Sequence, residues 1–220
     1  MSRDKKQWAV RFVEELSELS FSDVFNPYSD RCSVCDMENA AEIRRKNLER
    51  VLIAALSMQV DSVWVARDLG YRGGRRTGLA LTDDAHLDHH ARQFGGLPKL
   101  RRATREPEPP VERTATVVWQ TLGAIRRPVF LWNVFPFHPH EPGNEMSNRC
   151  HTRSERNACR HLLTDLLDAL KPGRVVAIGR DAHRSLEDLH IDATYVRHPS
   201  YGGQAEFISG LESIYGRRLA

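Results

Sequence analysis

The sequence predicts an α/β fold of three layers, in which a central four-stranded parallel sheet lies between helices. Four short apolar runs, rich in β-branched and aromatic residues, are typical of strands buried on both faces. These runs are residues 62–66, 128–133, 174–178 and 193–196. Helical patterns separate them, and strands that alternate with helices form parallel sheets through right-handed crossovers. With 220 residues, 40% of them hydrophobic, the chain can bury a sizeable core.

Two amphipathic helices are expected before the first strand, over residues 6–19 and about 40–56, because apolar residues recur in both at helical spacing. Their inner positions are Trp8, Phe12, Leu16, Leu19, Ile43, Leu48, Leu52 and Leu56. We expect residues 6–56 to pack on an α/β core of residues 60–217. The whole chain, 1–220, is therefore predicted to be a single domain.

The later helices are expected between and after the strands, over residues 115–124, 153–170, 181–188 and 204–215. Residues 95–113, rich in Gly, Pro and charge, predict a long excursion over the surface. Ligands of parallel sheets bind beyond the carboxyl ends of the strands. Chemistry is therefore expected in the segments that follow the strands, and these contain Gly, Arg, His, Asp and Asn.

The charge of the chain is nearly balanced, with 32 Lys and Arg against 29 Asp and Glu, for a formal net charge of +3. Net charge alone is therefore a weak argument for a polyanionic partner. The cations gather in two dense groups, which are either solvated loops or phosphate-binding surfaces. The groups are Arg67, Arg72, Arg75 and Arg76, and Lys99, Arg101, Arg102 and Arg105.

No apolar run approaches the roughly 18 residues of a membrane span. The first residues, Met1-Ser-Arg-Asp-Lys-Lys6, lack the apolar core of a signal peptide. We therefore expect a monomer that acts in the cytoplasm and has no membrane partner.

A glycine-rich loop follows the first strand and is compatible with close approach of the backbone to a phosphate. Its glycines are Gly70, Gly73, Gly74 and Gly78. No Gly-Lys-Ser/Thr follows, and the spacing is not that of the dinucleotide fingerprint. A transferase that uses a nucleotide through this loop remains an alternative.

Three further motifs follow the strands in a characteristic order. Asp68-Leu-Gly70 leads through the glycine loop to Thr77-Gly-Leu-Ala-Leu81, Asn133 ends the second strand, and His198-Pro-Ser200 follows the fourth. This order, over about residues 60–205, resembles that of the uracil-DNA glycosylase superfamily. The resemblance implies a four-stranded parallel sheet between helices. It also implies an enzyme that flips uracil out of DNA and hydrolyses its N-glycosidic bond, leaving an abasic site.

The resemblance implies two catalytic residues. Asp68 corresponds to the aspartate that positions a water and faces the developing sugar cation, and His198 to the histidine that stabilises the departing base as an anion. A fixed charge or donor aimed at developing charge lowers the barrier. The alternatives are that Asp68 caps a helix or pairs with Arg67 at the surface, and that the backbone satisfies His198.

The resemblance also implies the uracil pocket. Asn133 corresponds to the asparagine that reads the base, although it could instead cap a turn. Gly70 stands where many members have a tyrosine that excludes the methyl group of thymine, and Leu81 where they have the aromatic ring on which uracil stacks. Tyr71 is a substitute for the excluding wall, and Phe135 or Phe137 for the stacking ring, unless these aromatics belong to the core.

The predicted DNA contacts come from cations of the glycine loop, from the start of the helix after the third strand, and from the segment that begins at His198. A leucine that fills the gap in the base stack in other members is replaced by Gly202, so Tyr201 and Gln204 are expected to fill it. The predicted DNA-binding residues are Arg72, Arg75, Arg76, Arg180, Ser200, Tyr201 and Gln204.

The four cysteines, Cys32, Cys35, Cys150 and Cys159, are more plausible in the cytosol as thiols or metal ligands than as disulfides. One branch of the superfamily holds an iron–sulfur cluster with cysteines in this order, and four thiolates would also suit zinc. The spacing of the last two is shorter than in that branch, and Asp68 stands where that branch has a small residue. Our expectation is therefore no metal and no cofactor, with a cluster as the alternative. His138, His140 and His151 are expected to be solvated rather than ligands.

The predicted function is therefore that of a monofunctional uracil-DNA glycosylase whose partner is uracil-containing DNA. No lysine is close in sequence to Asp68 or His198, whereas glycosylases that cut the strand use an amine to form a Schiff base. A protein that binds uracil or abasic DNA without turnover is the alternative with the same pocket.

Overall fold

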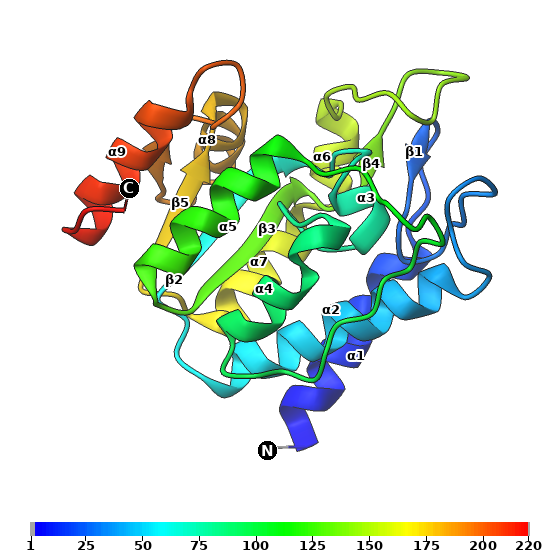
Figure 1. The fold of residues 1–220 in the computed structure, drawn as a ribbon, viewed down its shortest axis with the longest axis horizontal. Helices are drawn as coiled ribbons and strands as arrows, with labels where there is room; N and C mark the ends of the chain where they lie inside the picture. Colours follow the sequence, from blue (N-terminus) through cyan, green and yellow to red (C-terminus); the bar gives the residue numbers. More distant parts are fainter. Residues whose placement is uncertain (1–2, 220) are drawn as a thin grey trace.

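The computed structural model describes residues 3–219, and its centre is a four-stranded parallel sheet flanked by helices (Figure 1). The strand order is β3-β2-β5-β6, and each neighbouring pair is parallel. The strands are β2 (Ser62–Asp68), β3 (Val129–Phe135), β5 (Arg174–Ile178) and β6 (Thr194–Val196). The predicted fold class and all four predicted strands are confirmed, with shifts of one or two residues at their ends.

Two groups of helices cover the two faces of the sheet. α5 (Arg113–Ile125) and α9 (Gln204–Tyr215) supply the buried residues of the cluster on one face. The other face is covered by four longer helices that share the larger cluster, to which Leu87 and Ala91 of a shorter helix also contribute. The four longer helices are α1 (Arg3–Glu18), α2 (Ala40–Ser57), α7 (Arg160–Leu170) and α8 (Arg180–Asp188). Each of these six helices begins within three residues of a predicted start, except that one predicted helix is divided in two.

The helix predicted over 153–170 is interrupted at Cys159, whose ψ of 3° leaves the helical region. The short α6 therefore precedes α7. Sequence periodicity did not predict the remaining short elements, which depend on contacts with distant segments. In chain order the additional elements are β1 (Val24–Phe25), α3 (Gly74–Thr77), a 3-10 turn (Asp84–His86), α4 (Leu87–Gln93), β4 (His138–Pro139) and α6 (Arg153–Ala158), and β1 pairs with β4 in an antiparallel ladder.

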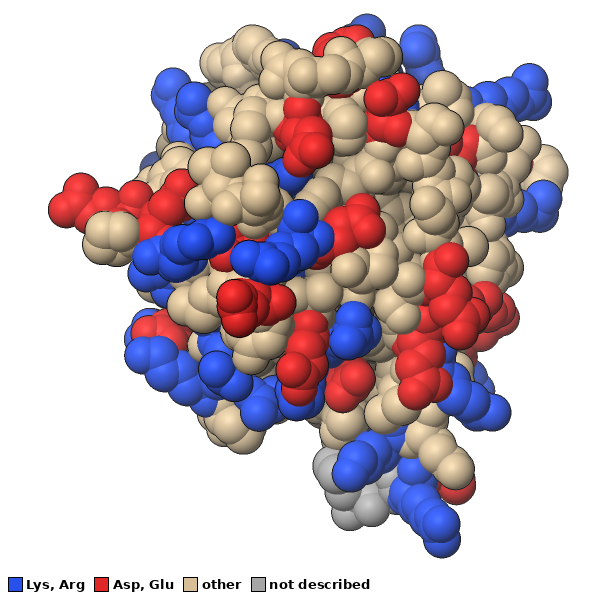
Figure 2. All heavy atoms as spheres, turned by 90° about the vertical axis from the view of Figure 1, so that its right-hand side faces the viewer, with Lys and Arg blue, Asp and Glu red and all other residues tan. Residues whose placement is uncertain are grey.

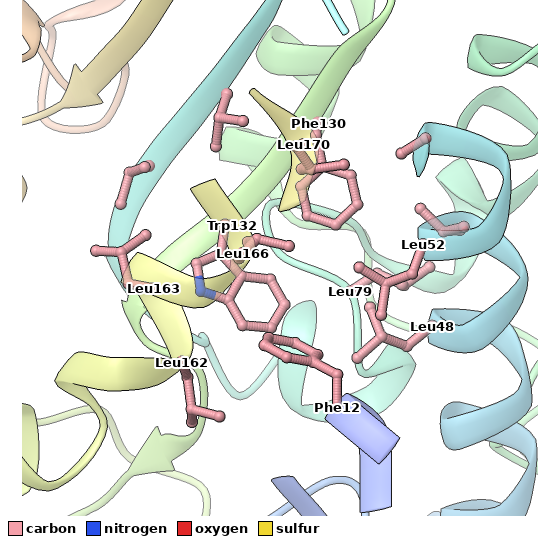
Figure 3. Close-up of a cluster of buried hydrophobic side chains, with 14 of the residues drawn as sticks. Phe12, Leu48, Leu52, Leu79, Phe130, Trp132, Leu162, Leu163, Leu166 and Leu170 are labelled. Carbon is pink, nitrogen blue, oxygen red and sulfur yellow. The ribbon is translucent and has the colours of Figure 1, made fainter. Parts of the chain in front are cut away.

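The larger core joins the N-terminal helices to the sheet. The ring of Phe12 on α1 stacks on Trp8 at 4.9 Å between centroids and meets Trp132 of β3 at 5.7 Å. Figure 3 shows Phe12 and Trp132 beside Leu48 and Leu52 of α2, with the leucines of α7 on the other side. Hence α1 and α2 contribute to the same core as the strands that carry the site.

The direction of α5 decides what lies at the carboxyl edge of the sheet. α5 ends at Ile125 and β3 begins at Val129, so the helix runs against the strands, as Figure 1 shows. Its first residues therefore lie at the edge where β2 and β3 end. α8 begins at the same edge, one residue after the end of β5.

The surface carries mixed charge on the face that Figure 2 shows, where Lys and Arg side chains are interspersed with Asp and Glu. This face, on the right of Figure 1, offers no extended basic patch. Within residues 3–219, no helix has both the length and the apolar character needed to cross a membrane.

The substitution Phe12→Ala tests whether α1 is part of the folding core. Truncating a buried phenylalanine costs about 3–5 kcal/mol, and Phe12 is 4% exposed between Trp8 and Trp132. We expect the free energy of unfolding, measured by urea denaturation, to fall by this amount. Val34→Ala, at a side chain 72% exposed, is the control and should change it by less than about 0.5 kcal/mol. Equal stability of both variants would show that α1 is dispensable.

Candidate active site

Asp68 is the last residue of β2, and both of its carboxylate oxygens have partners. Arg67 Nε donates to Asp68 Oδ2 at 2.6 Å, and the Nδ1 of His151 is hydrogen-bonded to Asp68 Oδ1. Arg67 also reaches Asp181 Oδ2 at 2.8 Å, near the start of α8. The Asp68 side chain is 5% exposed, so its charge is held at the edge of the sheet by a cation and an imidazole.

His151 is brought to Asp68 by the start of α6. Thr152 and Glu155 form a capping box, in which the Glu155 N–H donates to Thr152 Oγ1 at 3.2 Å and the Thr152 N–H donates to Glu155 Oε2 at 2.6 Å. His151 directly precedes this cap. Because an ionised carboxylate only accepts, Nδ1 of His151 carries the proton toward Asp68, which leaves Nε2 as an acceptor in the neutral ring. Nε2 has no hydrogen-bond partner among the described residues.

The sequence did not indicate that His151 contacts Asp68, and His151 was expected to be a solvated loop residue, whereas its side chain is 8% exposed. The sequence Thr152-Arg-Ser-Glu155 was the available signal, because a capping box marks where a helix begins. It does not indicate which strand the preceding residue meets. That contact follows from the packing of α6 against β3.

Asn133 lies inside β3, two residues before its end, and is 1% exposed. Neither its Oδ1 nor its Nδ2 has a hydrogen-bond partner, although both atoms are buried. An unpaired buried polar group costs about 1–3 kcal/mol, so such an amide marks a position where a ligand can supply the partners. Asn133 is paired in register with Ala66, and Asp68 with Phe135, so Asn133 and Asp68 lie on adjacent strands, two positions apart in register, near the carboxyl edge of the sheet.

His198 follows β6 and is held by Ser200. The backbone N–H of Ser200 donates to His198 Nδ1 at 3.2 Å, and the Ser200 hydroxyl lies 2.7 Å from the same nitrogen. Since a backbone N–H only donates, Nδ1 accepts and Nε2 carries the proton of the neutral ring. Burial, together with the positive charges of Arg67 and Arg197, lowers the pKa of His198 to about 4. His198 is therefore a neutral hydrogen-bond donor at physiological pH.

Gly179 makes room for His198. Gly179 has a φ of +91°, and a Cβ built on it would lie 3.1 Å from the Cβ of His198. Its N–H donates to the Val196 carbonyl at 2.8 Å, which joins the end of β5 to the end of β6. A side chain at position 179 would be strained and would displace the histidine.

Of the residues predicted to form the uracil pocket, Leu81 and Gly70 lie near the strand ends, whereas Phe135 lies in the core. Leu81, with a φ of +52°, lies in the cluster under α5, and Gly70 lies in the turn after β2. Phe135 is 0% exposed and packs against Phe21 and Phe137 at 5.5 Å and 5.3 Å between centroids. This corrects the expectation that Phe135 or Phe137 offers a stacking face, because both rings are used by the core.

Tyr71 lies on the outside of the glycine loop. Its ring is covered by the Arg72 guanidinium at 5.3 Å, and its backbone N–H donates to Asn148 Oδ1 at 3.0 Å. The space beside Gly70, where Tyr71 was expected to form a wall, is taken by a residue that the analysis of the sequence did not single out.

That residue is Glu112, directly before α5. A Cβ built on Gly70 would lie 3.2 Å from Glu112 Oε1, and one built on Gly73 would overlap Glu112 Oε2. The Glu112 carboxyl therefore occupies the space that side chains at positions 70 and 73 would otherwise fill. Burial and the neighbouring Asp83 raise the pKa of Glu112 to about 7, against a smaller lowering effect of Arg72. No local sequence pattern could have indicated this contact between the excursion 95–113 and the glycine loop.

Two of the predicted DNA contacts are corrected by the structure, because Arg75 and Arg76 are 1% and 4% exposed. Arg75 Nη2 pairs with Glu145 Oε2 at 3.1 Å, and its guanidinium lies 3.9 Å from the ring centroid of Phe25. Arg76 Nε donates to the buried carboxylate of Asp84 at 3.2 Å. Both arginines are therefore internal supports of the glycine loop, and neither is available to a phosphate.

The other predicted DNA contacts lie at the carboxyl edge. Arg72 is exposed on the glycine loop, and Arg180 is exposed as the first residue of α8. Tyr201 is 97% exposed with a φ of +51°, at the tip of the turn between β6 and α9, and Gln204 is the first residue of α9. Ser200 has a partner already, because its hydroxyl is bound to His198.

The cysteines do not assemble into one site. Cys32 and Cys35 lie beside Phe25, Cys159 belongs to the larger core, and Cys150 is exposed. Residues 3–219 contain no group of three or more His, Cys, Asp and Glu side chains that could hold a metal ion. The described structure therefore places the four cysteines in three different surroundings, and the expectation of no cofactor stays a prediction.

A four-stranded parallel sheet between helices, with an aspartate, an asparagine and a histidine near its carboxyl edge, defines an α/β protein whose candidate site lies at the strand ends. A model of the family described as the uracil DNA glycosylase superfamily matches residues 74–210, and the chain belongs to this superfamily. The matched region contains Asn133 and His198 and begins after Asp68.

Among solved structures, the chain is similar to the crystal structure of wild-type SMUG2 from Pedobacter heparinus, with a TM-score of 0.62 and 12% identity over 95% of this chain and 97% of that chain. At this identity the likeness shows the fold alone. A search of curated proteins found no match.

The protonation of His198 can be measured directly. Because its pKa is lowered to about 4, its ring should stay neutral while an ordinary histidine titrates near 6.5. We expect the His198 Cε1–H resonance, assigned with the variant His198→Gln, to keep a constant NMR shift between about pH 5.5 and pH 8. A midpoint near 6.5 would show that the ring is solvated.

The raised pKa of Glu112 predicts a pH-dependent effect on stability. The folded protein keeps this proton up to about pH 7, whereas the unfolded chain loses it near 4.5, so the contribution of Glu112 to stability is lost as the pH rises between these values. Glu112→Gln removes this loss. We expect the Tm difference, variant minus wild type, to be larger at about pH 8 than at about pH 5. A difference that does not change with pH would contradict the raised pKa.

Proposed function

We propose that this protein is a monofunctional uracil-DNA glycosylase, which excises uracil by base flipping and hydrolysis of the N-glycosidic bond. The observation that carries the proposal is the buried, unpaired side-chain amide of Asn133. Membership of the superfamily supports a glycosylase-type function, and the geometry around Asn133 supports uracil as the base.

The side-chain amide of Asn133 has one acceptor and one donor, which complement the donor and the acceptor on one edge of uracil. Uracil offers N3–H as a donor and O4 as an acceptor, so Oδ1 and Nδ2 of one side chain satisfy both. Cytosine presents the reverse pair at these positions. An amide held in one orientation in the complex would leave two polar groups unpaired against cytosine, a mismatch that can discriminate by several orders of magnitude. In the free protein neither amide atom has a partner, so this selectivity requires that the bound complex fixes the orientation.

His198 would stabilise the leaving base. As the bond between C1′ and N1 breaks, the electron pair moves onto the uracil ring and negative charge gathers on O2. The Nε2–H of a neutral His198 can donate to this oxygen without full proton transfer, and one such donor is worth about 3–4 kcal/mol. Ser200, which holds the other ring nitrogen, acts as a positioning residue.

Asp68 and His151 would serve the sugar and the water. The carboxylate of Asp68 stabilises the positive charge that develops on the deoxyribose. Its hydrogen bond to Nδ1 of His151 leaves Nε2 free to accept a proton from the attacking water. The water oxygen forms a bond to C1′, its proton passes to His151, and the uracil anion departs. The products are the abasic sugar and the free base.

DNA would approach the carboxyl edge of the sheet. Arg72 and Arg180 are exposed there and can contact phosphates, and the protruding Tyr201 can enter the gap left by the extruded nucleotide. Base flipping costs a few kcal/mol, which these contacts must offset. Among the described residues, no lysine is hydrogen-bonded or ion-paired to Asp68 or His198, in keeping with a glycosylase that leaves the strand uncut.

The test uses an oligonucleotide with one uracil, in single- and double-stranded form, followed by alkali treatment. We expect alkali-labile cleavage at the uracil with wild-type protein, and little cleavage without alkali. His198→Ala should lower the single-turnover rate by about 10²–10³-fold, because it removes one donor to the developing anion. Its circular dichroism and thermal midpoint are measured in parallel to show that the fold persists.

The matched control is His183→Ala, a second histidine on α8 that pairs with Glu187 and lies outside the site. It should retain the wild-type rate. Absence of alkali-labile sites at every salt concentration would refute the enzyme, and tight binding of uracil-containing DNA without turnover would support a reader of the same base. Equal rates for His198→Ala and wild type would remove His198 from the site.

A further inference from the structure

Glu112 occupies an unusual position for a carboxyl group. Its oxygens lie where the side chains of residues 70 and 73 would be, and both of those residues are glycines. No hydrogen bond to these oxygens is formed within residues 3–219, whereas the Glu112 backbone N–H is tied to Asp83 Oδ2 at 2.7 Å. The backbone is therefore anchored, and the carboxyl is left with free hydrogen-bonding capacity beside the turn that follows Asp68.

The topology places this carboxyl on the side of the sheet that Asn133 faces. α5 packs on the face that includes Leu131 and Ala66, and Asn133, which is paired in register with Ala66, has this same face by alternation. Asp68 ends β2 at the carboxyl edge of the sheet. Since α5 runs against the strands, Glu112 at its start lies at the edge where β2 ends. Leu81 belongs to the same cluster, and its carbonyl accepts a hydrogen bond from Trp119 of α5 at 3.2 Å.

The ring of a bound pyrimidine has a defined orientation in such a pocket. Suppose that N3–H and O4 of the base are hydrogen-bonded to Asn133 and that C1′ of the sugar lies beside Asp68. C5 and C6, which join C4 to N1, then form the edge of the ring between these two contacts. C5 is thereby turned toward the chain directly after Asp68. At Gly70 that chain has no side chain, and the first atoms beyond it are those of the Glu112 carboxyl.

We propose that Glu112 is a specificity-determining residue, whose carboxyl forms the wall beside C5 of the base and excludes the methyl group of thymine. This inference rests on the proposed function. It replaces Tyr71, whose ring lies under Arg72, as the residue that separates uracil from thymine.

Two physical effects make a carboxyl an effective wall. A methyl group at C5 would compete for the volume that the Glu112 carboxyl occupies beside Gly70 and Gly73, and the backbone from which this side chain starts is anchored by Asp83. The methyl would also remove water from the carboxyl without offering a hydrogen bond, and an unpaired polar group is penalised. Burial and Asp83 raise the pKa of Glu112 to about 7, against Arg72, so the neutral form that faces DNA phosphates without repulsion is accessible near neutral pH.

The experiment measures excision of uracil and of thymine from oligonucleotides of the same sequence by wild type, Glu112→Ala and Glu112→Gln. Removing a steric barrier to one methyl group changes selectivity by about 10–200-fold. We expect Glu112→Ala to lower the ratio of uracil to thymine excision by at least about tenfold. Glu112→Gln keeps the volume of the side chain and should keep the ratio. A ratio within one preparation is independent of how much protein is folded.

The matched controls are Glu108→Ala, an exposed glutamate of the same excursion, and Tyr71→Ala. Both should leave the ratio at its wild-type value. If wild type excises uracil and Glu112→Ala keeps the wild-type ratio, the inference is wrong and the proposed function stands. A ratio lowered by Tyr71→Ala but not by Glu112→Ala would assign the wall to Tyr71.

Failure of the proposed function gives a different result, because wild type then excises no uracil. In that case the same variants are compared by competition binding, with non-hydrolysable 2′-fluoro nucleotides carrying uracil or thymine in the oligonucleotide. A binding preference for uracil that narrows at least about tenfold in Glu112→Ala would support the wall in a non-catalytic pocket. An unchanged preference would overturn it.

Discussion

The carboxylate of Asp68 is the point on which the geometry of the site depends. One oxygen is held by Arg67, which also reaches Asp181 on α8, and the other by His151 in front of α6. These contacts thus link the end of β2 to the start of α8, which follows β5, and to the segment before α6. Removing one partner would leave a buried charge partly unpaired, which is far more costly than losing an exposed ion pair. The contact uses Nδ1 of His151, so Nε2 is the ring nitrogen that does not bind Asp68.

Around this anchor the protein keeps polar groups that it does not satisfy by itself. The amide of Asn133 is buried without partners, and the carboxyl of Glu112 stands in the glycine turn without a hydrogen bond among the described residues. His198 is kept neutral by burial and by neighbouring positive charge. Groups that are fixed and desolvated before a ligand arrives need no reorganisation when it binds, and this makes their hydrogen bonds effective in binding and catalysis. Unpaired buried groups lower the stability of the fold, and burial of the two apolar clusters on either side of the sheet offsets this loss.

Much of the fold and part of the site could be predicted from the sequence. Apolar runs and helical spacing are local patterns, so the strands and the helices α1 and α2 were found nearly at their observed bounds. Asp68, Asn133 and His198 were predicted from the resemblance to the superfamily, and the ends of parallel strands bring such residues to one edge of the sheet. Arg75 was predicted to contact DNA and Phe135 to line the uracil pocket, but both side chains are buried. Their burial is decided by residues far away in the chain, such as Glu145, which pairs with Arg75.

By itself, the sequence determined the order of strands and helices and the residue types at the strand ends, because backbone periodicity and turn chemistry are encoded within a few neighbouring positions. Only the tertiary structure decided which of these side chains meet. Glu112 lies against Gly70 and Gly73, and His151 against Asp68, through chain crossings that no local pattern records. The tertiary structure also decides the raised pKa of Glu112 and the lowered pKa of His198. Desolvation and charge proximity exist only when distant segments pack together.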